Sequence, residues 1–148
     1  MANVIPHSFK SELLSGTHDF ATGGDSFKLA LYTAGSGSPY AATDTAYSSS
    51  VSNEVSSGSG SGYTTGGVAL ASQAVATGTG TATVDFANLT FSSATFSAAY
   101  GVIYNDDKSD KLVVVLDFGG TKTATNGDFT IVFPDPSTPS NAIISLTS

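Results

Sequence analysis

Three carboxylates crowd one short segment of this chain, which otherwise has few side chains suited to chemistry. Asp106, Asp107 and Asp110 stand in the stretch Asn105-Asp106-Asp107-Lys108-Ser109-Asp110. Clustered carboxylate oxygens are typical ligands of Ca²⁺. The stretch departs from an EF-hand loop, because it has no Gly at the sixth position and no terminal Glu. We therefore favour a solvated turn that caps its own backbone, with a weak cation site as the alternative.

Nucleophilic catalysis lacks its usual partners in this sequence. A serine hydrolase needs Ser, His and an acid together, and the chain has two histidines, His7 and His18. No G-x-S-x-G elbow is present, because residues 58–62 read Gly-Ser-Gly-Ser-Gly and place Gly where the nucleophile would be. A glycosidase needs two carboxylates about 5–10 Å apart in a cleft, whereas most Asp residues fall at predicted turns. We predict no catalytic residues and no enzymatic activity.

Charge and composition disfavour cofactors, nucleic acid and membranes as partners. The formal net charge is −7, with five Lys and no Arg, so no basic patch for a phosphate backbone can form. Phosphate-binding and dinucleotide-binding fingerprints are absent, as is Cys. The first residues show no basic and apolar leader, and no run of about 18 apolar residues occurs. We expect no cofactor, no nucleic-acid partner, no signal peptide and no membrane span.

The composition predicts a folded β protein with long polar loops. Ser, Thr and Gly account for 58 of the 148 residues, while 40% of the chain is hydrophobic and 10% aromatic. A chain of this length buries about 70% of its unfolded surface, so its core needs no disulfide or metal. Nine Phe and six Tyr argue against disorder. We predict one domain that spans residues 1–148.

One short helix is predicted near the N-terminus, over residues 7–14. Phe9, Leu13 and Leu14 recur at helical spacing, and Ser15-Gly16 provides a stop signal. Ser8 is placed to cap the start of the helix.

The rest of the chain predicts an all-β fold, an antiparallel β-sandwich or jelly-roll-like arrangement of about eight strands. Residues 26–33 alternate as in a half-buried strand, whereas the apolar run 112–116 indicates a central strand covered on both faces. Asn126-Gly127 is a strong turn signal. The expected strands are residues 26–33, 68–76, 80–87 with 89–91, 95–105, 111–118, 129–133 and 141–147.

Residues 34–66 form a long stretch dominated by Ser, Thr, Gly and Ala, for which a mobile surface loop is the favoured interpretation. A loop this long in a compact domain is often functional instead. Its tyrosines can dock onto the protein body or onto a partner. Together with the N-terminal segment 1–20, this loop supplies our candidate interface residues: Phe9, Leu13, Tyr40, Tyr47 and Tyr63.

Several short stretches, which together cover most of the chain, resemble sequences of a known class of proteins. The stretches are residues 8–10, 12–16, 18–20, 27–33, 62–67, 103–105, 115–119 and 126–133, for example Gly62-Tyr63-Thr64-Thr65-Gly66-Gly67 and Asn126-Gly127-Asp128-Phe129-Thr130-Ile131-Val132-Phe133. In these stretches the chain resembles small virion proteins encoded by tailed bacteriophages. Its size and all-β character are similar to jelly-roll cement, or decoration, proteins that clamp capsid shells.

The resemblance implies a non-enzymatic capsid cement or decoration protein that binds and stabilises the major capsid protein shell. We would then expect it on the capsid exterior of the virion, and in the host cytoplasm during assembly. Because most assemblies close, a homo-oligomer, dimer or trimer, is expected. Segment 1–20 or loop 34–66 would contact neighbouring subunits, and deletion of residues 40–60 would weaken attachment while leaving the fold intact.

The alternative is a tail-associated or fibre-associated adhesin that recognises a glycan on the host surface. It would use the loop tyrosines, with the Asp106–Asp110 turn and Ca²⁺ as a further contact. A soluble enzyme ranks behind both interpretations, because the sequence reveals no cleft that gathers acids.

Overall fold

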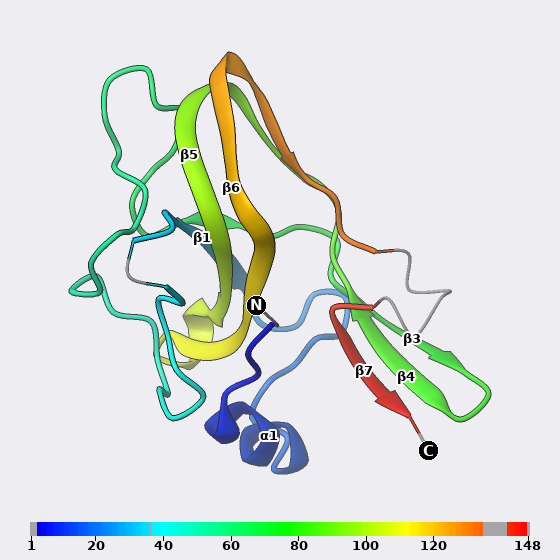
Figure 1. Cartoon of the computed structure of the whole chain (residues 1–148). Helices are drawn as coiled ribbons and strands as arrows, with labels where there is room; N and C mark the ends of the chain where they lie inside the picture. The colour runs from blue at the N-terminus through cyan, green and yellow to red at the C-terminus, as the bar shows by residue number, and fades with distance from the viewer. Residues whose placement is uncertain (1–2, 36, 135–141, 148) are drawn as a thin grey trace.

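A computed structural model describes residues 3–35, 37–134 and 142–147 of the chain. Two antiparallel β-sheets and one short α-helix make up the described fold, which confirms the predicted all-β class with its N-terminal helix (Figure 1). The described residues form seven strands rather than about eight, in sheets of four and three strands. Their order does not establish a jelly roll.

The larger sheet has the order β2-β1-β5-β6, with strands β2 (Val68–Ala69), β1 (Phe27–Tyr32), β5 (Leu89–Asn105) and β6 (Lys111–Ile131). β5 and β6 form one long antiparallel ribbon, joined by the short 3-10 helix η1 (Asp106–Lys108) (Figure 1). Val4 and Ala46 pair with the start of β6 on its outer edge.

Strand β1 is buried on both faces, because its neighbours cover the sheet from two sides. Phe27, Leu29 and Leu31 belong to one hydrophobic cluster, whereas Ala30 and Tyr32 belong to a second cluster on the opposite face. All five side chains are inaccessible to solvent. The predicted alternation of the strand is therefore confirmed, but the prediction that it is half-buried is wrong.

The smaller sheet has the order β3-β4-β7 and projects from the body beside the larger one (Figure 1). Its strands are β3 (Ala74–Gly78), β4 (Thr81–Asp85) and β7 (Ile144–Thr147). The predicted strand 68–76 is wrong as a single element, because the chain leaves the larger sheet after Ala69 and enters the smaller one at Ala74. Ser72, between them, has a positive φ of 55°.

One expected turn lies inside a long strand instead. Asn126-Gly127 does not end a strand: Gly127 lies opposite Ala94 within the β5–β6 ribbon, so the turn prediction is wrong. The register shifts on both sides of Ala94, and Ser93 and Asn126 both have positive φ angles. Such β-bulges bend a strand pair without ending it. Residues 89–91, which we expected to continue the strand 80–87, therefore join residues 95–105 in one bent strand, and β6 likewise continues past residue 118.

The helix α1 spans His7–Leu14, as predicted. Pro6 stands at its N-cap, so the predicted cap by Ser8 is wrong. Gly16, with φ of 70°, ends the helix: its N–H bonds to the Leu13 carbonyl, and the next N–H bonds to the Glu12 carbonyl. This pattern is a Schellman motif, in which glycine avoids the Cβ penalty. Leu14 is 91% exposed and takes no part in the buried helix face.

Segment 37–66 wraps around the larger sheet at its β1 edge (Figure 1). Tyr40 and Val51 pack in the cluster on one face, whereas Val55 and Tyr63 pack in the cluster on the other. The segment therefore covers core surface, and the interpretation of residues 34–66 as a mobile surface loop is wrong for these parts. Deletion of residues 40–60 would expose both clusters, so we now expect this deletion to destabilise the fold.

No helix in the described part of the chain is long and apolar enough to cross a membrane.

Replacement of Gly67 by Ala will destabilise the fold more than the same change at the neighbouring Gly66. Both glycines have positive φ angles, 83° and 95°, which cost a non-glycine residue about 1–3 kcal/mol. A Cβ on Gly67 would also overlap the backbone of Leu29, whereas a Cβ on Gly66 meets nothing within 4 Å. We expect a further loss of about 1–3 kcal/mol in Gly67→Ala, measured by urea unfolding. Equal losses in the two variants would contradict the close contact with β1.

Candidate functional site

Three of the five predicted interface residues are core residues. Phe9, Tyr40 and Tyr63 are 2%, 3% and 4% exposed. Leu13 is partly buried and packs against the core, and Tyr47 is also partly buried. The contacts of Phe9, Tyr40 and Tyr63 lie within the chain, so these side chains offer no surface to a partner.

Tyr40 and Tyr47 of the loop meet the tyrosines of the larger sheet on one of its faces. Tyr47 stacks on Tyr104 of β5, with ring centroids 4.5 Å apart and planes at 11°. The Tyr40 hydroxyl lies 3.2 Å from that of Tyr32 in β1 and accepts a hydrogen bond from the Ser48 backbone N–H. The segment is thus held on the sheet by polar and apolar contacts together.

Glu54 joins the two halves of this segment. Its carboxylate accepts hydrogen bonds from the Tyr47 hydroxyl at 2.8 Å, the Tyr63 hydroxyl at 2.7 Å and the Gly66 N–H at 2.6 Å. The Tyr63 hydroxyl also accepts from the Leu31 N–H at 3.0 Å. A tyrosine side chain thereby takes the place of a neighbouring strand on the outer edge of β1, and Glu54 fixes that side chain.

The tyrosine hydroxyls of this cluster keep their protons at neutral pH. Burial raises the pKa of Tyr47 and of Tyr63 well above the usual tyrosine range, and the neighbouring Glu54 carboxylate raises both further, against an opposing bond from Leu31 at Tyr63. Burial likewise raises the pKa of Tyr104. The arrangement suits a structural clasp and gives no base or nucleophile.

A second polar network links α1 to the turn between β5 and β6. The His18 Nε2 lies 3.1 Å from the Glu12 carboxylate, and its Nδ1 lies 2.9 Å from the Asn105 amide nitrogen. The same amide nitrogen donates to Asp25 at 2.9 Å. Lys111 contacts Glu12 and Lys108 contacts Asp25, so a lysine stands at each end of the chain of contacts.

The geometry defines which nitrogen of His18 carries the proton. The Asn105 side-chain oxygen accepts from the Asp107 N–H, so its amide nitrogen faces His18 and can only donate. Nδ1 of His18 is therefore the acceptor, and Nε2 donates to Glu12. The His18 side chain is fully inaccessible to solvent, so it organises the network without access to a substrate.

The two carboxyl groups of this network have lowered pKa values. Burial acts to raise the pKa of Glu12, but hydrogen bonds from Lys111 and His18 outweigh that effect. Burial also acts to raise the pKa of Asp25, and bonds from the Asp19 backbone, Asn105 and Lys108 outweigh it. Both acids are consequently charged and paired at neutral pH.

Two of the three carboxylates in the Asp106–Asp110 turn bind β1 and the residue before it rather than a common centre. Asp106 pairs with Lys28 at 2.8 Å, and Asp107 accepts from the Ser26 N–H at 2.7 Å. Across the described ranges, no group of three or more His, Cys, Asp or Glu is arranged to hold a metal ion. The turn thus connects the end of β5 to β1. Among the described residues its carboxylates do not form the candidate cation site.

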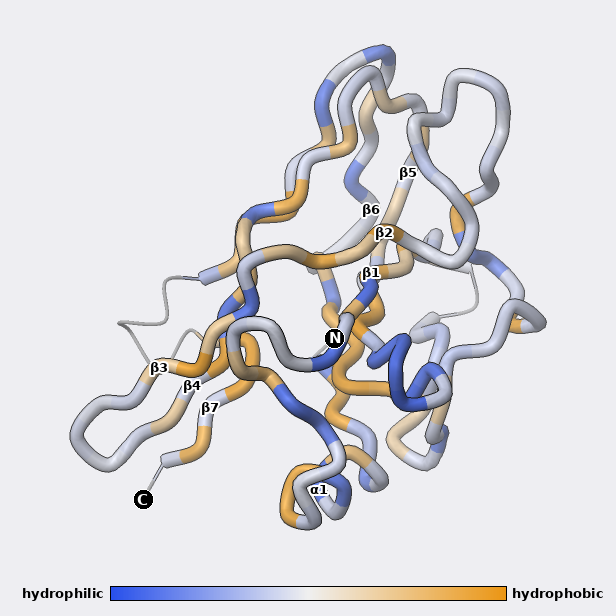
Figure 2. Tube along the Cα trace, turned by 180° about the vertical axis from the view of Figure 1, so that it is seen from behind, coloured by the Kyte–Doolittle hydropathy of each residue, from blue (hydrophilic) through white to orange (hydrophobic). Residues whose placement is uncertain are grey.

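The smaller sheet presents an exposed apolar surface. Its strands carry several hydrophobic residues (Figure 2). A cleft of about 280 Å³ lies between this sheet and the N-terminal segment, lined among others by Leu13, Phe20, Val75, Val84, Ile144 and Leu146. Val84 and Ile144 are buried at its inner end, whereas Val75 and Leu146 are 51% and 56% exposed.

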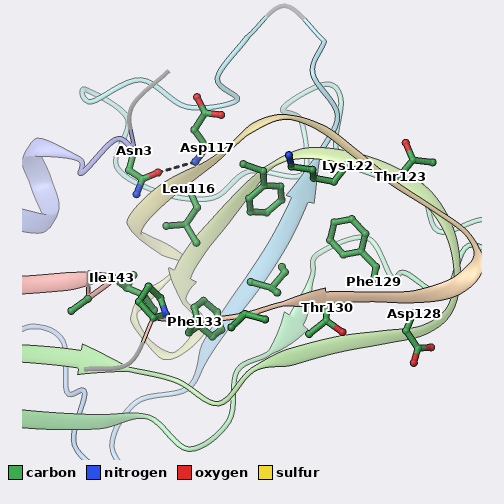
Figure 3. A pocket seen from close by; sticks show the side chains of 15 residues that line it. Asn3, Leu116, Asp117, Lys122, Thr123, Asp128, Phe129, Thr130, Phe133 and Ile143 are labelled. Carbon is green, nitrogen blue, oxygen red and sulfur yellow. Dashed lines mark hydrogen bonds between the residues drawn. The ribbon is translucent and has the colours of Figure 1, made fainter. Parts of the chain in front are cut away.

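A second hollow, of about 550 Å³, lies in the bend of β6 (Figure 3). Both limbs of the strand line it, since residues 116–118 and 128–131 contribute from opposite sides of the bend. Its apolar side chains are partly or fully buried except for that of Val132, and Lys122 and Asp128 are exposed. Apolar lining residues are Leu116, Phe118, Phe129, Ile131, Phe133 and Ile143.

Sequence patterns did not single out Val75, Leu146 or Val132 as surface residues. Each lies in or beside an expected strand, where alternation predicts a buried face. Alternation reports that one face of a strand is apolar, but it does not report whether another layer covers that face. The exposure of these residues follows from the way the small sheet and the bent ribbon extend past the core.

Comparisons of the chain with protein-family models, with curated proteins and with solved structures found no match. The resemblance to bacteriophage virion proteins therefore remains an expectation from the sequence.

Replacement of Glu54 by Gln will loosen the segment that wraps β1. The variant loses the charged acceptor of three hydrogen bonds, which come from Tyr47, Tyr63 and Gly66. The amide N–H₂ group of the new Gln would also face at least one of these three donors. Hydrogen bonds to charged groups contribute about 1.5–3 kcal/mol each, and we expect a net loss of about 2–3 kcal/mol in the free energy of unfolding.

A control in the same segment is Asp44→Asn, which alters one exposed hydrogen bond from the Ala41 N–H. We expect it to cost less than about 1 kcal/mol in urea unfolding. A Glu54→Gln variant as stable as this control would show that the clasp is not needed.

Acid will weaken the fold through Glu12 and Asp25. Their folded pKa values lie below the unfolded ones, so the stability that they contribute is complete above the unfolded values and is lost as the pH falls through the folded ones. Urea unfolding from about pH 7 to about pH 3 should show a decreasing free energy of unfolding. In Asp25→Asn the free energy of unfolding should decrease less steeply with falling pH. An unchanged slope in that variant would show that Asp25 does not contribute to the acid sensitivity.

Proposed function

We propose that this protein is a non-enzymatic structural protein that binds the outside of a virion shell, with the major capsid protein as its partner. The observation that carries the binding role is the exposed apolar surface of the smaller sheet. The virion assignment itself comes from the sequence resemblance.

The exposed side chains of that sheet share one face, so a single partner surface can cover them. Val75 lies opposite Val84, which lies opposite Ile144, and Ala82 lies opposite Leu146. Residues that are directly opposite or two apart in neighbouring strands point to the same side. A partner that covered Val75 and Leu146 would extend the hydrophobic core that begins at Val84 and Ile144. Such a contiguous apolar strip is typical of a protein interface.

The chemistry of the polar groups also favours binding over catalysis. His18, Glu12 and Asp25 are paired with one another or with lysines, and Glu54 is bound by two tyrosines and a backbone N–H. Enzymes arrange such groups in a cleft that a substrate can reach. Here they connect segments of the fold, which fits a rigid decoration protein.

The adhesin alternative has less support from the same residues. It relied on the loop tyrosines, two of which are buried, and on the Asp106–Asp110 turn, in which Asp106 and Asp107 bind Lys28 and Ser26. We therefore place the partner contact on the smaller sheet and move it from segment 1–20 and loop 34–66, where the sequence had suggested it.

Leu146→Asp will reduce the number of copies on the shell. An exposed aspartate in the apolar strip must be desolvated on binding, and the loss of a central interface residue typically costs 2 kcal/mol or more, roughly a thirtyfold loss of affinity. The measurement is the ratio of this protein to the major capsid protein in purified virions, by quantitative mass spectrometry. Leu14→Asp, at a 91% exposed site outside the cleft, is the control of equal charge.

Hundreds of wild-type copies in a simple ratio to the capsid protein, reduced in Leu146→Asp alone, are the expected result. A handful of copies in the wild type would move the protein to the tail or fibre. Its absence from virions would overturn the proposal.

A further inference from the structure

Asn126 is the one asparagine in the described parts of the chain whose side chain forms no hydrogen bond. Each of the other four accepts a bond from a backbone N–H or donates one, and these are Asn3, Asn53, Asn88 and Asn105. The Asn126 side chain is also exposed to solvent. Asparagine is a chemically labile residue, and a carboxamide without a hydrogen-bond partner can turn toward its own backbone.

The backbone at Asn126 lies outside the regular pairing of the β5–β6 ribbon. The register shifts on both sides of Ala94, and Asn126 has no opposite residue in it. At this point β6 has two residues, 125 and 126, where β5 has Thr95 alone, so Asn126 stands in a β-bulge. Its N–H donates to the Thr95 hydroxyl at 2.9 Å, and its φ is 50°. Asparagine adopts such a left-handed conformation more readily than most residues.

Gly127 leaves the space beside the Asn126 carboxamide empty, because glycine has no Cβ. The residues that follow the other four described asparagines all have a Cβ, which hinders attack by their backbone nitrogen on the preceding side chain. The fold does not require glycine at position 127. Its φ is not positive, and a Cβ there would meet the Thr125 carbonyl oxygen at 3.8 Å, an ordinary contact.

We propose that Asn126 is a modification site at which the folded protein deamidates spontaneously, with water as the co-reactant. The Gly127 nitrogen bonds to the Asn126 Cγ, and the bond from Cγ to Nδ2 breaks. A proton moves through solvent from the Gly127 nitrogen to Nδ2, which leaves as ammonia. Water then opens the cyclic imide at either carbonyl. Cleavage between Cγ and the nitrogen gives Asp, whereas cleavage between the main-chain carbonyl carbon and the nitrogen gives isoaspartate.

Both products change the surface of the ribbon at its bulge. Each adds one negative charge to β6, two residues before Asp128 in the chain. Isoaspartate also carries the main chain through Cγ, so it lengthens the backbone by one atom between Thr125 and Gly127. The pairing with β5 must then adjust next to Ala94, where the register already shifts.

The test follows the conversion of Asn126 in the purified full chain, kept in mildly alkaline buffer and sampled by peptide mapping with mass spectrometry. Asn53 is the internal control, because it is also exposed with a positive φ, 75°, but is followed by Glu54. We expect Asn126 to convert at least about tenfold faster than Asn53. Gly127→Ala should slow the conversion of Asn126 at least about tenfold.

Gly58→Ala is the matched variant, because a Cβ on Gly58 meets nothing within 4 Å and residue 127 is unchanged. It should leave the rate at Asn126 as it is in the wild type. A rate at Asn126 no higher than at Asn53 would overturn the proposal, and so would an unchanged rate in Gly127→Ala.

The same measurement in urea shows whether the fold permits the reaction. A native rate within about a hundredfold of the rate in the unfolded chain supports the proposal. A slower native rate would show that the ribbon keeps the Gly127 nitrogen from reaching Asn126, which would overturn it. The inference does not rest on the virion assignment, because every measurement uses the purified chain.

Discussion

The fold depends on strand β1, which must be covered on both faces and also along one edge. Its side chains are buried to either side, so both faces of the larger sheet are covered around β1. Along its outer edge the partners change from residue to residue: β2 at Lys28 and Leu29, the Tyr63 hydroxyl at the Leu31 N–H, and the Asn53 and Val55 backbone beyond. Because no single strand could supply all of these, segment 37–66 must wrap around the edge.

This constraint explains the use of polar side chains inside the protein. Glu54 holds two tyrosines from different faces of the sheet, and the His18 network holds α1 against the end of the long ribbon. Both sites satisfy buried donors and acceptors, which would otherwise cost about 1–3 kcal/mol each. A chain rich in Ser, Thr and Gly thus gains rigidity from a few charged residues with several partners.

The same arrangement leaves two surfaces uncovered. The smaller sheet extends beyond the hydrophobic core (Figures 1 and 2). The β5–β6 ribbon bends, so that its distal part lies away from the other strands of the larger sheet (Figure 1). One surface is the apolar face of the smaller sheet, and the other is the hollow in the bend of β6.

Local patterns determined the elements of this protein: the helix 7–14 with its glycine stop, the alternation of β1 and the apolar run at the start of β6 all appear where the residues place them. These features depend on near neighbours in the chain, so the sequence alone predicts them. Tertiary structure decided what covers them. Asn126-Gly127 became a bulge because Ala94 lies opposite, and Tyr40 and Tyr63 became core because β1 needed cover. Val75 and Leu146 stayed exposed because no layer of the described chain covers them. Burial depends on contacts between distant segments, which no periodicity along the chain records.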